Sequence, residues 1–293
     1  MGKVIFIERN SVKEAWLEAM VRTMIDGDKI KTEYDKPEDP PSRDITACIV
    51  VKEPFSDPIK RKGKKIVMKT KHGNQFNLYG HIGDVILPMS IKGGYIEEIM
   101  EGKNDIGVRD SEISPSYTYH DRLFNYYPYS QEDIKDSPRE DMTFESERGG
   151  LLALILKSED QIEQIINKLI ESGYTRRAQA TTWRPYSDPY RNDPPCLQRI
   201  WARIKNRKLD FHTSWRSRDL FKAWQTNVNG MITLQKAIAL RIPVRTGIYV
   251  DFTNSLHIYG KDMEKVKIFF ETVLNRKDAP EYLLKEIKKI KWR

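Results

Sequence analysis

The segment from Tyr174 to Asn227 constrains the fold of this chain more than any other. It contains Cys196, one of two cysteines in 293 residues, directly after two prolines. Alternating apolar residues follow Cys196 as far as Asn206-Arg207, and a second alternating run leads back to Arg216. This pattern predicts a β-hairpin, and the two ends of a hairpin lie side by side. We therefore expect Cys196 and Arg216 to meet in space.

Arginines surround Cys196 in the sequence: Arg176 and Arg177 precede it, and Arg216 and Arg218 follow it. A nearby guanidinium group stabilises a thiolate, so it lowers a thiol pKa that is about 8.5 in water. Guanidinium groups also fit phosphate oxygens. This combination favours a reactive thiol facing a phosphorylated substrate. The alternative is a small buried side chain with no chemical role, which is what we expect for Cys48.

A helix is predicted from Asp219 to Leu240, because Asp219 is a good N-cap and apolar residues recur at helical spacing after it. Asn227 falls inside that apolar stripe. A buried side-chain amide needs partners for both its oxygen and its nitrogen. Asn227 could therefore read a ring that presents a carbonyl beside an N–H group, or it could be a core residue bonded to the backbone.

The order and spacing of four short motifs resemble the signature of the thymidylate synthase family. The motifs are Pro194-Pro195-Cys196, Arg216-Ser217-x-Asp219, Asn227 and His257-x-Tyr259. The resemblance covers roughly residues 95–260 and implies an α+β fold, with a large mixed β-sheet covered by helices and sheet faces packed in a homodimer. We expect one domain over residues 1–293. Residues 1–90 would be its divergent N-terminal portion, and residues 128–150 a loop insertion.

The resemblance also implies roles for individual residues. Cys196 would be the nucleophile, Asn227 would select uracil, and Asp219 would contact the pterin. Proton transfer would fall to Tyr119 with Glu98 or Glu97. The phosphate would be held by Arg176 and Arg177 from across a dimer interface together with Arg216 and Ser217, and the ribose hydroxyl by His257 and Tyr259. Arg43, in a stretch similar to the pyrimidine hydroxymethylase branch, is a candidate fourth phosphate-binding arginine.

The implied reaction is the reductive methylation of dUMP to dTMP, with no metal. Its co-substrate would be 5,10-methylenetetrahydrofolate or a tetrahydromethanopterin analogue. The sequence departs from the family pattern at His120, Leu197 and Trp215, and it ends in Lys-Trp-Arg in place of a small apolar tail. A deoxyuridylate hydroxymethylase is therefore an alternative. A non-catalytic, basic nucleic-acid-binding protein is another.

Net charge and hydropathy limit the classes of molecule that this protein is expected to bind. A formal net charge of +8 and an isoelectric point near 9.2 favour anionic partners such as nucleotides. The basic run Lys60 to Lys71 could contact nucleic acid, although a solvated turn before a strand fits it better. No apolar run approaches the roughly 20 residues that a membrane span needs, and no signal peptide is recognisable. We expect a cytoplasmic protein that does not bind membranes.

Hydrophobic periodicity and capping residues predict the remaining elements. They are a strand at Lys3 to Glu8, a helix at Val12 to Ile25 capped by Ser11, a loop at Glu33 to Asp44, a strand at Ile45 to Glu53, a helix at Tyr95 to Gly102, a pair of strands at Val244 to Phe252 and Ser255 to Tyr259, and helices at Lys261 to Asn275 and Pro280 to Ile290.

Overall fold

The computed structural model describes residues 3–56, 65–69, 75–79, 95–102, 117–127, 158–275 and 281–292. The strands in this part are β1 (Val4–Arg9), β2 (Asp28–Ile30), β3 (Ser42–Val51), β4 (Lys65–Lys69), β5 (Gln75–Tyr79), β6 (Gln179–Thr181), β7 (Leu197–Lys205), β8 (Lys208–Asp219) and β9 (Arg245–Ile258). The α-helices are α1 (Val12–Asp26), α3 (Tyr95–Glu101), α5 (Tyr119–Phe124), α8 (Gln161–Glu171), α9 (Trp224–Arg241), α10 (Met263–Leu274) and α11 (Glu281–Ile287). Two short 3-10 helices lie at Asp188–Tyr190 and Gly260–Asp262.

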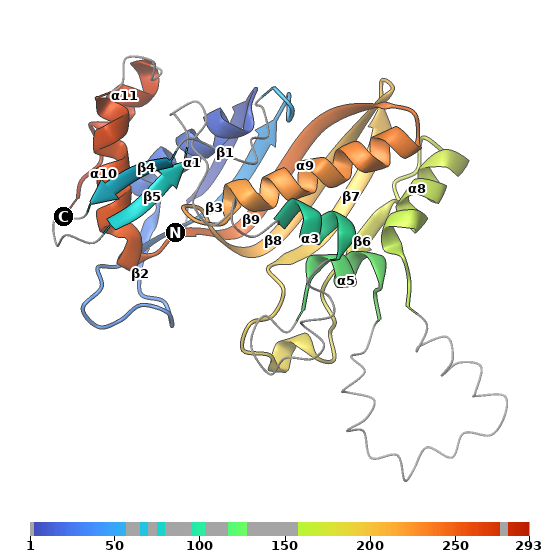
Figure 1. The fold of residues 1–293 in the computed structure, drawn as a ribbon, viewed down its shortest axis with the longest axis horizontal. Coiled ribbons are helices and arrows are strands. Elements are labelled where there is room, and N and C mark those ends of the chain that lie inside the picture. Colours follow the sequence, from blue (N-terminus) through green and yellow to red (C-terminus); the bar gives the residue numbers. More distant parts are fainter. Residues whose placement is uncertain are drawn as a thin grey trace, which may run out of the picture.

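A seven-stranded sheet organises the described chain (Figure 1). Its order is β1-β3-β9-β8-β7-β6, with β2 paired to β3. The β1–β3 and β8–β9 pairs are parallel and the other pairs in this sheet are antiparallel. The predicted α+β class with a large mixed sheet is confirmed, because helices cover this sheet while strands from both ends of the chain enter it.

One face of the sheet carries the hydrophobic core. Helices α1 and α9 lie along this face in Figure 1, and large aromatic side chains such as Trp16, Trp215 and Trp224 are buried beneath them. The indole N–H of Trp16 donates to the carbonyl of Leu220 at 2.8 Å, so this buried tryptophan has a polar partner. Among the described helices, none is long and apolar enough to cross a membrane.

On the other face of the sheet, several apolar side chains of the described strands are exposed near the N-terminal edge. Val4 and Phe6 on β1 are 69% and 61% exposed, and Phe252 on β9 is 37% exposed. Cys48 points to this side of β3 and is half-buried, so the prediction that it packs within the core is wrong. The alternation of a strand explains the result, since its neighbours Ala47 and Ile49 take the core-facing positions.

Several local predictions are confirmed. Helix α1 begins with a capping box in which Ser11 and Glu14 bond each other's backbone N–H groups. The hairpin of β7 and β8 turns at Asn206 and Arg207, whose φ angles of 52° and 57° match the two-residue turns that suit twisted strands. Cys196 and Arg216 therefore lie at the same end of this hairpin.

Three predictions of where elements begin and end are wrong. Asp219 is the last residue of β8, and α9 begins only at Trp224. The Asp219 carboxylate does accept a backbone N–H, but from Lys222, in a turn ahead of the helix. The predicted pair of strands at 244–259 is instead the single long strand β9. Thr253 and Asn254, which lie between the two predicted strands, continue the extended strand, where Thr253 is buried and donates to Asp251. Residue 42 also begins β3, so the predicted loop ends earlier.

Candidate active site

A cavity of about 660 Å³ lies where β3, β8 and β9 approach one another with two loops above them. Its lining comprises Ile30, Thr32, Glu33, Tyr34, Asp44, Asn192, Asp193, Cys196, Arg216, Ser217, Ser255, His257 and Tyr259. This volume is within the usual range of small-molecule sites. The structure thus brings together five residues that the sequence placed in one site: Cys196, Arg216, Ser217, His257 and Tyr259.

The hairpin fixes Arg216 against the segment that carries Cys196. The backbone N–H of Arg216 donates to the carbonyl of Cys196 at 2.9 Å. Its guanidinium group donates to the carbonyl of Pro195 at 3.0 Å and to that of Pro194 at 2.6 Å. The two prolines offer these carbonyls without adding backbone donors of their own. Arg216 is therefore held beside the thiol by backbone groups that do not depend on a ligand.

The electrostatics of Cys196 differ from the prediction. Burial raises the pKa of the Cys196 thiol, and the carboxylate of Asp193 raises this pKa further. Arg216 and Arg218 lower the pKa, but by less, so the net direction is upward and not downward as the sequence suggested. Burial is the largest cause that raises the pKa of Tyr117, Tyr119 and Tyr259, and the negative charge of an ionised Cys196 raises each pKa further.

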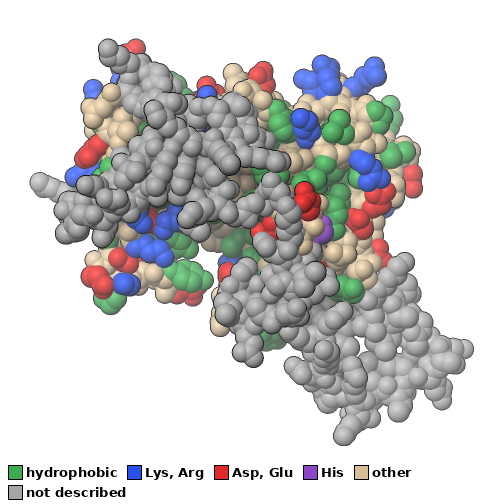
Figure 2. Space-filling view, in the orientation of Figure 1, with side chains coloured by type: hydrophobic (Ala, Val, Ile, Leu, Met, Phe, Trp, Pro, Cys, Tyr) green, Lys and Arg blue, Asp and Glu red, His purple; other side chains and the backbone are tan. Residues whose placement is uncertain are grey.

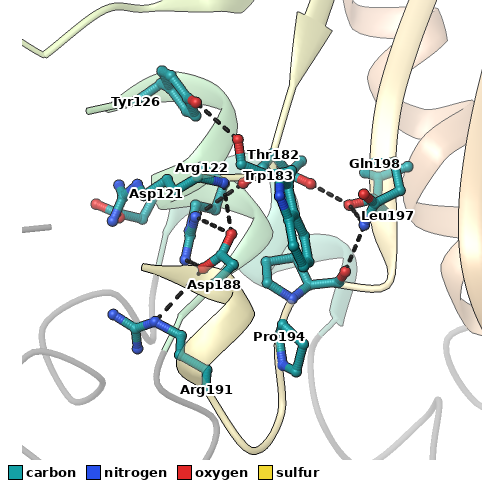
Figure 3. A network of polar contacts seen from close by, with 12 residues as sticks. Asp121, Arg122, Tyr126, Thr182, Trp183, Asp188, Arg191, Pro194, Leu197 and Gln198 are labelled. Carbon is teal, nitrogen blue, oxygen red and sulfur yellow. Dashed lines mark hydrogen bonds and ion pairs between the residues drawn. The ribbon is translucent and has the colours of Figure 1, made fainter. Parts of the chain in front are cut away.

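A buried ion pair stabilises the loop that leads to Cys196 (Figure 3). Arg122 and Asp188 form a two-pronged pair, with nitrogen–oxygen distances of 3.0 and 2.7 Å, and both side chains are completely buried. The same guanidinium group donates to the carbonyl of Thr182 at 2.9 Å, and the Thr182 hydroxyl donates to the carbonyl of Leu197. Helix α5, which carries Arg122, is thus linked to the residue that follows Cys196.

Tyr119 lies close to Cys196 in the same region. Its hydroxyl accepts the backbone N–H of Leu197 at 3.2 Å, one residue from Cys196. Burial is the largest cause of a shift that raises the pKa of Tyr119 to about 12. Its ring contacts those of Tyr117 and Trp215 edge to face. The predicted place of Tyr119 beside the nucleophile therefore agrees with the geometry, while its role in proton transfer stays a prediction.

Asn227 is held by two neighbours and does not line the cavity described above. Its Oδ1 accepts from Nε of Arg218 at 3.3 Å, and its Nδ2 donates to the Tyr95 hydroxyl at 2.9 Å. These contacts fix which end of the amide is oxygen and which is nitrogen. Each end keeps capacity for one more hydrogen bond, because an amide oxygen accepts two bonds and an amide nitrogen donates two.

Arg218 is itself positioned by deeply buried groups. It forms an ion pair with Asp251, and its guanidinium carbon lies 3.5 Å from the centre of the Trp215 ring. Asp251 also accepts from the hydroxyls of Tyr249 and Thr253, each at 3.0 Å. The contact between the Arg218 guanidinium group and the Trp215 ring gives a structural role to Trp215, a residue at which the sequence departs from the family pattern. A series of polar contacts therefore connects Asp251 through Arg218 to the Asn227 amide.

Helix α3 brings Tyr95 to Asn227. A Cβ atom added at Gly230 of α9 would lie 2.7 Å from the ring of Tyr95, so the two helices approach too closely for any side chain there. Glu98 lies one turn from Tyr95 and its charge raises the Tyr95 pKa, after the larger effect of burial. Glu98 therefore belongs to this neighbourhood, and its catalytic role is untested; the side chain of Glu97 lies outside the described part of the chain.

His257 and Tyr259 extend the site along the end of β9. The Nδ1 atom of His257 lies 3.2 Å from the carbonyl oxygen of Ser255, and the Ser255 hydroxyl donates to Asp44. Within the described residues the Nε2 atom of His257 is buried with no hydrogen-bond partner. His257 lines the cavity, and a buried nitrogen without a partner is suited to a ligand hydroxyl. Asp219 pairs with His257 in the sheet but does not line the cavity.

Three predicted phosphate ligands are not in this cavity. Arg176 and Arg177 are exposed in the segment before β6. Arg43 lies in β3 and lines a different cavity, where it donates to the carbonyl of Gly27 at 3.4 Å. Arg216 is thus the only lysine or arginine among the described lining residues, and it faces the carboxylates of Glu33, Asp44 and Asp193.

Sequence reasoning missed the supporting residues Arg122, Asp188, Tyr95 and Asp251. Asp251 left a visible signal, because a carboxylate inside an otherwise apolar strand requires a buried partner. Arg122 and Asp188 left none, since their pairing joins segments 66 residues apart. No group of three or more His, Cys, Asp or Glu side chains in the described part of the chain is arranged to hold a metal ion.

Comparison with known proteins supplies an independent observation. The family model described as "Thymidylate synthase" matches residues 108–291. A Methanocaldococcus jannaschii protein named "Putative thymidylate synthase" is 27% identical over 277 residues, which cover 92% of this chain and 98% of that protein. Proteins of the same name from Methanosarcina acetivorans and Methanosarcina mazei are 36% and 35% identical over 108 residues, which cover 37% of this chain and half of each relative.

Proposed function

Because this chain belongs to the thymidylate synthase family, we propose that it converts dUMP to dTMP through a covalent bond between the Cys196 sulfur and C6 of the pyrimidine. The observation that carries the proposal is the shared cavity of Cys196, Arg216, Ser217, His257 and Tyr259. A nucleophile, a guanidinium group and two potential hydroxyl ligands there face one space of nucleotide size. The proposed activity is that of a methyltransferase.

The chemistry requires the thiolate and not the thiol. The sulfur adds to C6, and the electron pair of the C5–C6 double bond moves toward the ring carbonyl, so that C5 becomes nucleophilic. C5 bonds to the one-carbon unit and then loses its proton as the bond between that carbon and the pterin breaks. Hydride transfer to the same carbon makes it a methyl group, and the C5–C6 double bond re-forms as the sulfur leaves C6. The co-substrate, 5,10-methylenetetrahydrofolate or a tetrahydromethanopterin analogue, supplies the carbon and the hydride. Tyr119 and Glu98 are the proposed proton carriers, and Asp219 the proposed pterin contact.

Uracil recognition is proposed for Asn227, whose amide is not among the described lining of the Cys196 cavity and would have to be reached past that lining. Arg218 and Tyr95 fix the amide so that one acceptor position on Oδ1 and one N–H on Nδ2 are still available. Uracil presents an N–H at N3 beside a carbonyl at C4, which matches this pair. Cytosine has an unprotonated ring nitrogen beside an amino group, so it would oppose donor to donor and acceptor to acceptor.

Phosphate binding is proposed to need a second copy of the chain. A phosphate dianion in this cavity would meet one guanidinium group and three carboxylates, which is unfavourable electrostatically. Arg176 and Arg177 are exposed and free to reach outward. The uncovered sheet face that carries Val4, Phe6 and Phe252 offers an apolar surface for a homodimer. We therefore propose that these arginines complete the partner's site.

The proposed enzyme is a single-domain protein of the cytoplasm. Residues 1–293 would form a single domain, since β1 and β3 join the sheet that carries β7, β8 and β9. The segment 128–150, expected to be an insertion, lies outside the described residues. Both cysteines are free thiols, which suits the reducing environment of the cytoplasm.

The decisive experiment is trapping with 5-fluoro-dUMP, which cannot lose a proton from C5. Wild-type protein incubated with this nucleotide and each candidate pterin should gain the mass of both ligands. Cys196→Ser should gain neither, while the matched variant Cys48→Ser should behave like wild type. Absence of an adduct with every pterin would contradict the proposal. The mass of the product from dUMP then separates a methyl from a hydroxymethyl group.

A further inference from the structure

A second cavity, of about 690 Å³, has no role in the proposed reaction. It is lined by Met24, Ile25, Lys29, Arg43, Lys289, Lys291 and Trp292. Four of these residues are cationic and, among the described lining residues, none is acidic. They come from three separate parts of the chain: the end of α1 with β2, the start of β3, and the segment after α11. Figure 2 shows Lys and Arg side chains gathered at the position that β2 takes in Figure 1.

The sheet register places like charges against each other here. Lys29 of β2 and Arg43 of β3 are direct cross-strand partners, and like charges in such positions destabilise a sheet. Burial also lowers the pKa of Arg43, which reflects the cost of desolvating its charge. Lys289 pairs with Glu286, but no described carboxylate forms an ion pair with Arg43 or Lys291. An anion in the cavity would supply a counter-charge to Arg43 and Lys291.

The cavity also has an aromatic wall. Trp292 is 37% exposed and packs against Phe270, with 6.0 Å between their ring centres. Together with Met24 and Ile25 it gives the cavity an apolar side next to its cationic side. A flat ring can stack on an indole while its charged substituents reach lysine and arginine. An inorganic anion would contact the cationic side of the cavity but would gain nothing from its apolar side.

This cavity is distinct from the one that holds Cys196. Lys29 and Arg43 line the second cavity, whereas the next residues along each strand, Ile30 and Asp44, line the first. Successive residues of a strand point to opposite faces, so β2 and β3 form a wall between the two cavities. A ligand in one could therefore influence the other through this strand pair.

We propose that this second cavity binds a free nucleotide with two or more phosphate groups, the base on Trp292 and the phosphates on Arg43, Lys29, Lys289 and Lys291. The site would be separate from the dUMP site. The assignment does not depend on the proposed reaction, because it uses none of the residues around Cys196.

Equilibrium dialysis of the full-length protein tests the proposal, with dTTP, tripolyphosphate and thymidine as probes. We expect dTTP to bind and each half of it to bind much more weakly. Lys291→Glu should weaken dTTP binding by about tenfold or more through charge reversal. The matched variant Lys288→Glu, three residues away in the sequence and outside the described cavity lining, should bind like wild type. Trp292→Ala should weaken binding, and Trp292→Phe should restore most of it.

Three outcomes would overturn the assignment. Equal loss in Lys288→Glu and Lys291→Glu would mean that only overall charge matters. Unchanged dTTP binding in Lys291→Glu would place the nucleotide elsewhere, for instance at the Cys196 cavity. Tripolyphosphate binding as tightly as dTTP, or a short single-stranded oligonucleotide binding more tightly, would exclude a free nucleotide as the specific ligand. Circular dichroism of each exposed-residue variant confirms that it is folded.

Discussion

Arg218 and Asp251 form an ion pair in which the two side chains are 1% and 0% exposed, and the Arg218 guanidinium group also donates to Oδ1 of Asn227. The position of the Asn227 amide thus depends on a charge pair inside the core. We predict that Asp251→Asn lowers the free energy of unfolding by about 3–5 kcal/mol, because it leaves an uncompensated buried cation. Urea denaturation measures this change.

An exposed ion pair provides the comparison for Asp251. Lys285 and Glu281 pair on α11 with side chains that are 71% and 84% exposed, so Lys285→Ala should leave the unfolding midpoint nearly unchanged. A similar loss in both variants would contradict the special importance of the buried pair. An unfolding free energy of Asp251→Asn equal to that of the wild type would also contradict it.

The pH dependence of thiol alkylation should reveal the raised pKa of Cys196. In a Cys48→Ala background, the rate of reaction with iodoacetamide should rise with pH on the alkaline side of an ordinary thiol, because burial and Asp193 disfavour the thiolate. Asp193→Asn should move this profile to lower pH, and Arg216→Ala should move it to higher pH. A shift in the reverse direction for either variant would refute the electrostatic assignment.

Replacement of Asn227 by aspartate should weaken the preference for uracil. A carboxylate offers acceptors only, so it repels the ring carbonyl of uracil and, once protonated, can suit cytosine. The ratio of kcat/KM for dUMP to that for dCMP should fall at least about tenfold. Tyr95→Phe, which removes only the partner of Nδ2, should lower kcat/KM for dUMP while retaining the preference. An unchanged ratio in Asn227→Asp would reject the role.

His257 is predicted to bind the substrate sugar through its buried Nε2 atom. His257→Ala should raise KM for dUMP by roughly tenfold, which corresponds to the loss of a hydrogen bond of about 1.4 kcal/mol. The same change should have no effect on KM for 2′,3′-dideoxyuridylate, which lacks the hydroxyl. If His257→Ala weakens both nucleotides equally, the histidine supports the fold and not the sugar.

Mixing two inactive variants tests whether Arg176 and Arg177 act across a dimer. The Arg176→Ala/Arg177→Ala double variant and Cys196→Ser should each be inactive alone. After unfolding and refolding together, half of the dimers are mixed, and each should contain one complete site, so about a quarter of wild-type activity returns. Failure to regain activity would place the arginines in their own chain's site or outside any site.

The hairpin was predictable from the sequence because its information is local. Alternation and the Asn206-Arg207 turn specify both strands, and the hairpin then brings Cys196 and Arg216 together. Likewise Ser11 and Glu14 identify the start of α1 within four residues of chain. Short-range patterns of this kind need no knowledge of the rest of the fold.

The remainder of the site depends on contacts between distant segments. The Arg122–Asp188 pair and the Tyr95–Asn227 bond join residues that no sequence pattern links. The direction of the Cys196 pKa shift failed for a related reason. The sequence shows the arginines near Cys196, but it does not show that the thiol is buried or that Asp193 approaches it. Burial and Asp193 together raise the thiol pKa by more than the arginines lower it.

Gly230 carries a consequence for how this protein can diverge. The space that a side chain would fill there is taken by the Tyr95 ring, which in turn supports the Asn227 amide. Any lineage that acquires alanine or a larger residue at position 230 must shrink residue 95 or let the two helices separate, and either route would disturb the amide for which we propose base selection. Substitutions at these two positions should therefore occur in tandem, and a homologue that changes both is the place to look for an altered pyrimidine preference.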